Sequence, residues 1–209
     1  MKLKYNDYNK MPLKVFNKLK DISDLDAVDY EIELLSILCD CSIDDILDLS
    51  LTEYSKIRKD AQFVANYPEC EGDIPDKLTI NGNKYYICKN LKQVTTAQYI
   101  DYQSYLKEGE RHFEYLLSCF IIPEGKEYGK DYDIDDVIKD ILELDVVKVE
   151  KISFFFLNLF LASIEVSVNY WESTLKKMLK KEKNEEMKMK IQESLNLIHS
   201  LKNGDGLQM

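Results

Sequence analysis

The chain has 209 residues, of which 45% are hydrophobic and 32% are charged, and its formal net charge is −10. This composition is typical of a globular protein and argues against an intrinsically disordered one. An acidic surface repels phosphate backbones, which argues against general nucleic-acid binding. Only 7 Gly and 4 Pro are present, and so few helix breakers favour long helices.

The first 66 residues are predicted to form short helices, none of them long enough to be stable alone. One helix is expected over 11–19, with Pro12 near its first turn. Over 24–39 the apolar positions fall at spacings of three and four and form one helical stripe: Val28, Ile32, Leu35 and Leu38. Asp24 or Asp26 can cap that helix.

Two further helices are expected before residue 66. Ser42 followed by Asp45 resembles a capping box, with Asp in place of the usual Glu. Thr52 is expected to cap a helix that continues through Ala65 and has three main apolar positions: Ile57, Ala61 and Val64.

The segment 67–145 is predicted to contain one β-hairpin among helices. Asn81-Gly82 stands between two β-prone runs and tolerates the positive φ angles of a type I′ turn. A lone hairpin is marginally stable, so it must pack on helices or pair with a strand of a partner protein. Thr95 and Gln98 match a capping box for a helix that ends near Lys107, and its apolar stripe is expected to be Tyr99, Tyr102 and Leu106.

The rest of the chain is also predicted to be helical. Helices are expected over 110–122, which Pro123 ends, and over 134–144. The longest should cover about 149–182, and a last helix over 185–201 should fold back along three apolar positions: Met189, Leu195 and Ile198. The apolar run 152–164 is shorter than the roughly 20 residues that a membrane span needs, so we expect it to be buried.

We therefore predict a mainly α fold with one small β-hairpin and a long C-terminal helix. Three segments are expected, 1–66, 67–145 and 146–209, and they should form one cooperative unit. No sequence repeat is evident.

No known catalytic motif occurs in the chain, so we expect a protein that is not an enzyme and has no cofactor. The acidic segment 131–136 resembles a calcium loop, but the EF-hand positions six and twelve are Asp136 and Leu142 where Gly and an acid are required. Acidic residues near a helix N-terminus are the favoured interpretation. His112 and Cys119 lie seven residues apart, but nothing in the sequence shows the close geometry of a nucleophilic pair.

The five cysteines predict free thiols and no metal site. Their number is odd, and the opening segment lacks the apolar core of a signal peptide, so synthesis in a reducing cytoplasm is expected. Cys39 and Cys41 do not have the two-residue spacing of a zinc site, and only two histidines exist.

A run of lysines near the C-terminus has two interpretations. Five lysines are involved: Lys176, Lys177, Lys180, Lys181 and Lys183. Three acids, Glu182, Glu185 and Glu186, lie among or just after them, which favours a solvated helix face over a nucleic-acid site. Specific nucleic-acid binding is therefore not expected.

The 14 tyrosines are the most informative side chains, because tyrosine suits both cores and protein interfaces. A core position is favoured for Tyr86 and Tyr99. We nominate six residues as candidate partner-binding positions: Tyr102, Tyr105, Tyr128, Tyr132, Phe154 and Trp171.

Three segments carry a resemblance to a known group of proteins. Residues 74–103 resemble a pattern, "inGkkY" followed by "dl..lT.gQyiD", that occurs in virion-gene neighbourhoods of phages infecting Bacteroidetes. Residues 117–128 resemble the following "a.ll.P.g..Y" loop, and 154–161 resemble an "FF" helix. Cys119 and Phe120 depart from it, since small aliphatic residues are common there.

The resemblance implies a structural or cargo protein of crAss-like and related tailed bacteriophages, located in the virion and made in the bacterial cytoplasm. Its partners would be other phage structural proteins, such as portal, tail or copies of itself. The first alternative is a cytoplasmic tail-assembly chaperone that is absent from the mature virion. The second is an undetected enzyme with converging carboxylates, such as a nuclease or hydrolase.

Overall fold

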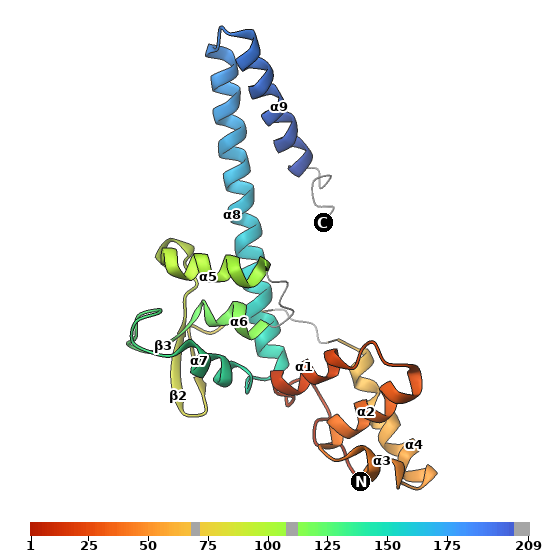
Figure 1. Cartoon of the computed structure of the whole chain (residues 1–209). Coiled ribbons are helices and arrows are strands. Elements are labelled where there is room, and N and C mark those ends of the chain that lie inside the picture. The colour runs from red at the N-terminus through yellow and green to blue at the C-terminus, as the bar shows by residue number, and fades with distance from the viewer. Residues whose placement is uncertain (68–71, 108–112, 203–209) are drawn as a thin grey trace. The chain divides into compact units, whose positions relative to one another are not determined.

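The computed structural model describes residues 1–67, 72–107 and 113–202, with backbone alone at 107, 160–167 and 200–202 (Figure 1). The chain divides into two compact units, Met1–Phe154 and Phe155–Met209. The first unit contains short helices and a small sheet, and the second contains most of a long helix and the helix that follows it. The mainly helical class predicted from the sequence is confirmed.

The first unit begins with four short helices, α1 (Leu13–Asp21), α2 (Ala27–Cys39), α3 (Ile43–Leu47) and α4 (Leu51–Asp60), then a 3₁₀ turn, η1 (Ala61–Ala65). Asp26 caps α2, and Ser42 with Asp45 forms the predicted capping box of α3. The short elements are stabilised where their inner side chains, such as Leu35 and Leu38, are fully buried.

Two details of this region differ from the sequence prediction. The cap of α4 is Ser50, two residues before the expected Thr52, because Ser50 has extended backbone angles and shares a capping box with Glu53. Val28, expected on the buried stripe of α2, is 67% exposed. It lies in the first turn of that helix, while the contacts of the helix with the core are made near its other end.

A three-stranded antiparallel sheet forms the middle of the unit, in the order β1 (Lys77–Ile80), β2 (Asn83–Ile87) and β3 (Ile121–Pro123). The predicted hairpin is confirmed: Asn81 has φ 51° and Gly82 has φ 84°, the positive values that the tight turn requires. The third strand was not predicted, because Ile121–Pro123 was assigned to the end of a helix. Its pairing with β2 supplies the packing that the hairpin alone lacks.

The other helices of this part of the unit are η2 (Leu91–Gln93), α5 (Thr96–Lys107), α6 (Phe113–Ser118) and α7 (Ile134–Ile141), of which α6 and α7 contact β3. The predicted capping box of α5 is present, with Thr95 and Gln98 each bonding the other's backbone N–H. Gln98 is also buried and donates to the carbonyl of Cys119 at 2.8 Å. The predicted stripe is wrong for Tyr99 and Leu106, which are exposed, because α5 turns its Gln98 side toward the β3 segment.

Backbone hydrogen bonds join the N-terminal helices to the end of the first unit. The Leu13 amide donates to the carbonyl of Leu144 at 2.8 Å, and the Val146 amide donates to the carbonyl of Met11 at 3.0 Å. Met11, Leu13 and Val146 are fully buried at this junction. Segments more than a hundred residues apart in sequence therefore share one core.

The long helix α8 (Val146–Lys181) continues from the first unit into the second, where α9 (Glu185–Lys202) runs back along it (Figure 1). Ile191 and Leu195 are the buried positions of α9, whereas Met189, expected on that face, is exposed. In α8, Ile152 and Phe156 are buried and Phe154 is exposed. None of the described helices is long and apolar enough to cross a membrane.

Candidate functional site

The region from α2 to α4 carries a strong negative charge. Residues 21–55 contain eleven Asp or Glu and no Lys or Arg. Two of these acids pair with cations from outside the stretch: Asp40 with Lys4 at 2.5 Å, and Glu31 with Arg58 at 2.8 Å. Most of the negative charge of this region is therefore uncompensated by neighbouring cations.

Three exposed aliphatic side chains lie within this acidic region. Ile43, Leu47 and Leu51 are 42%, 59% and 85% exposed, and we call them the α3–α4 ridge. Within the same helices Ile46 and Ile57 point inward and are buried. Ile43 and Leu47 share one side of α3 because they are four residues apart. Segment 43–53 adds four acids and no base around them.

The ridge was not predicted from the sequence, although one signal was present. The five-residue helix α3 has apolar residues at three of its positions, and a helix that short cannot bury all of them on one side. The four-residue spacing of 43 and 47 indicated a second apolar side of this helix. Several exposed aliphatic residues close together are more informative than single ones, which are common on protein surfaces.

A groove of about 700 Å³ lies between α2 and the α4–η1 segment. Leu34, Leu35 and Val64 contribute apolar side chains to its lining, and Glu31 and Arg58 contribute charged ones. The hydroxyl of Tyr54 donates to Glu31 at 2.6 Å, so this carboxylate is shared between a tyrosine and an arginine. The groove is lined mainly by apolar groups.

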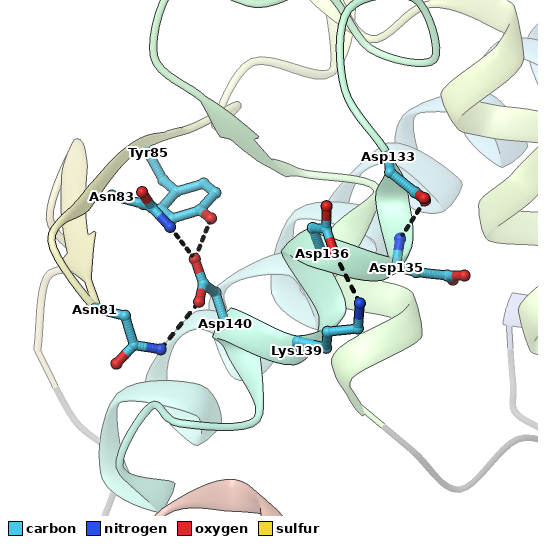
Figure 2. Close-up of polar contacts among 8 residues, drawn as sticks. All are labelled: Asn81, Asn83, Tyr85, Asp133, Asp135, Asp136, Lys139 and Asp140. Carbon is cyan, nitrogen blue, oxygen red and sulfur yellow. Dashed lines mark hydrogen bonds and ion pairs between the residues drawn. The ribbon is translucent and has the colours of Figure 1, made fainter.

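A buried carboxylate connects the hairpin to α7 (Figure 2). Asp140 accepts hydrogen bonds from the Asn81 amide at 2.9 Å, from the Asn83 amide at 2.8 Å, and from the Tyr85 hydroxyl. Burial acts to raise the pKa of Asp140, but these three bonds together outweigh it and hold the pKa below its ordinary value. With its lone pairs engaged by fixed donors, Asp140 acts as a structural latch.

The acidic segment before α7 has a capping role. Asp133 accepts a hydrogen bond from the Asp135 amide at 3.0 Å, and Asp136 pairs with Lys139 at 2.8 Å (Figure 2). The sequence-based interpretation of these acids as N-terminal residues of a helix is confirmed. In the part of the chain that the structure describes, no three His, Cys, Asp or Glu side chains gather closely enough to hold a metal ion.

The six predicted partner-binding residues fall into three environments. Tyr102 meets Phe120 in an edge-to-face arrangement, and Tyr105 contacts Tyr115 at a tilted angle, with ring centroids 5.4 and 5.5 Å apart. Tyr128 is buried and lies beside the half-buried Tyr132, while Phe154 and Trp171 are exposed. The structure therefore brings Tyr128 and Tyr132 together. In the isolated chain the four tyrosines pack against other rings.

The four cysteines that the structure describes are free thiols. Cys88 and Cys119 are buried, and Cys39 and Cys41 are half-buried; Cys70 and His112 lie outside the described residues. Burial raises the pKa of Cys119 to about 12 and that of Cys39 to about 11, so both remain protonated and poorly nucleophilic at neutral pH.

Residues that carry the phage resemblance contact one another. Gln98 donates to the carbonyl of Cys119, and Asp101 accepts a hydrogen bond from the Tyr128 hydroxyl at 2.9 Å. The first motif segment on α5 is thereby attached to the second, which includes β3 and the following loop. These polar residues hold α5 against the 117–128 segment, so the residues that carry the resemblance have a structural role in the fold.

The second unit presents a basic end where α8 meets α9. Residues 176–190, which we call the hairpin tip, contain seven Lys and three Glu. Lys176, Lys188 and Lys190 pair with glutamates of their own helix, and the other four lysines form no ion pair with the described residues. Three methionines of the tip are at least half exposed: Met178, Met187 and Met189.

No protein-family model, no curated protein and no solved structure matches this chain. The functional argument therefore depends on the chain's own residues.

Proposed function

We propose that this chain is a component of a tailed-bacteriophage particle, either packaged cargo or a portal- or tail-associated subunit, that acts through protein–protein contacts. The observation that carries the interaction role is the α3–α4 ridge, three exposed aliphatic side chains in an acidic surface. The phage context comes from the resemblance of residues 74–103, 117–128 and 154–161 to virion-associated sequences.

The size of the ridge supports a binding role for a physical reason. Fully burying a Leu or Ile side chain gains roughly 1.5 to 3 kcal/mol, so covering the exposed fractions of Ile43, Leu47 and Leu51 gains about 3 to 6 kcal/mol. That gain is comparable with the lower estimates of the entropy lost on association. A partner therefore needs polar or ionic contacts as well, and the surrounding acids offer sites for them.

The chemistry of the described titratable groups supports a role without catalysis. Asp140 is engaged by three donors, and the buried thiol of Cys119 has a raised pKa. Glu114, another buried carboxylate, accepts from the side-chain amide of Asn17 at 3.1 Å. Each of these groups is held by neighbours inside the fold, away from the apolar groove.

Mass spectrometry of purified phage particles tests the proposal. We expect this chain in mature particles at a fixed copy number relative to the portal protein. Abundance in infected cells combined with absence from washed particles would contradict a virion component and favour the assembly chaperone. Release of the chain together with the genome would distinguish packaged cargo from a subunit that stays with the portal or tail.

A further inference from the structure

The charge of the chain is divided unevenly between its two units. Residues 1–154 contain 31 acids and 20 bases, whereas residues 155–209 contain 7 acids and 8 bases. The acidic excess is concentrated in 21–55, and the basic excess in the hairpin tip, 176–190. The same molecule thus has one strongly negative surface region and one positive region.

Each of these regions also exposes apolar side chains. The α3–α4 ridge has branched aliphatic residues, and the hairpin tip has three methionines, whose flexible side chains adapt to irregular apolar surfaces. Charge of opposite sign surrounds the two apolar groups. Complementary potentials steer association and set orientation, while apolar contact supplies affinity.

We propose that the α3–α4 ridge of one copy of this chain binds the hairpin tip of a second copy. In this contact Ile43, Leu47 and Leu51 pack against the tip methionines, and Asp44 and Asp48 face Lys177 and Lys180. The inference rests on the proposed function, because it names the partner of the ridge.

The proposed contact is heterologous, since each copy offers two different surfaces. Such contacts extend head to tail and produce a closed ring or an open filament, depending on whether the rotation between copies closes. Asp44, Asp48, Lys177 and Lys180 are exposed and form no ion pair within the described part of the chain, so they are available to a second copy.

Sedimentation of the full chain over a range of concentrations tests the proposal. We expect oligomers that grow with concentration at about 50 mM salt, with an apparent dissociation constant at least about tenfold weaker at about 500 mM salt. A chain that stays monomeric at all concentrations would overturn the proposal, because a contact between two copies must become more populated as concentration rises.

Charge reversal then separates the two surfaces. A ridge variant carries Asp44→Lys and Asp48→Lys, and a tip variant carries Lys177→Glu and Lys180→Glu. Each variant alone is expected to sediment as a monomer, because it lacks one of the two surfaces that the contact needs. An equimolar mixture should associate again, because each variant supplies the surface that the other has lost. A control matched to the tip variant, Lys92→Glu with Lys126→Glu, makes the same change of net charge at other exposed lysines and should associate like the wild type.

Three results would contradict the pairing: no recovery in the mixture, unchanged association of either variant alone, or loss of association in the control. Binding of a short DNA duplex by the tip in place of self-association would replace it with a nucleic-acid site. Circular dichroism of each variant confirms that the fold is kept. A monomeric chain that is nevertheless found in particles would refute this inference and leave the proposed function intact.

Discussion

Replacing Asp140 by alanine removes the one acceptor that three side chains of the hairpin share. Asn81 and Asn83 are exposed, so water can replace their hydrogen bonds. Tyr85 is only 4% exposed, so its hydroxyl loses its partner inside the protein. A buried donor left without a partner costs about 1 to 3 kcal/mol, and the lost bonds to a charged acceptor add to it.

We therefore expect Asp140→Ala to lower the free energy of unfolding by about 2 to 4 kcal/mol, which lowers Tm by roughly 5 to 15 °C in a chain of this size. Urea denaturation followed by circular dichroism measures the change. The matched control is Asp136→Ala, which removes an exposed carboxylate from the same helix and should leave the midpoint unchanged.

A second substitution tests the mechanism. Tyr85→Phe removes the hydroxyl that Asp140→Ala leaves unsatisfied, so adding it to Asp140→Ala should cost little or restore some stability, whereas alone it should destabilise. Equal costs of Tyr85→Phe in both backgrounds, or an Asp140→Ala no worse than the control, would refute the latch.

The latch also predicts a dependence on pH. The pKa of Asp140 is held below its ordinary value, so its contribution is complete above the unfolded-state pKa of about 3.9 and is lost as pH falls through the folded-state pKa. The stability difference between wild type and Asp140→Ala should therefore shrink on acidification below about pH 4. A difference that stays constant through this range would contradict the assignment.

Three other positions give independent tests. Gly82→Val should lower the free energy of unfolding by about 2 kcal/mol, because φ at this position is +84°. No atom lies within 4 Å of the added Cβ, so the effect comes from backbone strain and not from a clash. Urea midpoints should show a smaller loss for Gly82→Asn. Gln98→Ala should cost about 2 to 3 kcal/mol through the lost cap and the orphaned Cys119 carbonyl, and thermal unfolding should show no such loss for the exposed Gln93→Ala. The Cys119 thiol, with its pKa near 12, should resist iodoacetamide at about pH 8 until the chain is unfolded, whereas prompt labelling of the folded protein would disprove its burial.

The sequence by itself determined the features that depend on neighbours within four residues. The Asn81-Gly82 turn and the capping boxes at Ser42 and Thr95 were predicted and are present. Each is a local hydrogen-bonding or backbone preference, so the residue types suffice to specify it. The long C-terminal helices were also predicted, from apolar spacing and the scarcity of glycine and proline.

Only the tertiary structure decided which sides of those elements are buried. Val28, Tyr99 and Met189 were expected to face the interior and are exposed, because burial depends on which distant segment packs on each helix. The β3 strand exists because β2 offers it an edge, which residues 121–123 alone do not reveal. The three donors to Asp140 lie 55 to 59 residues away from it, and no short-range pattern brings such groups together.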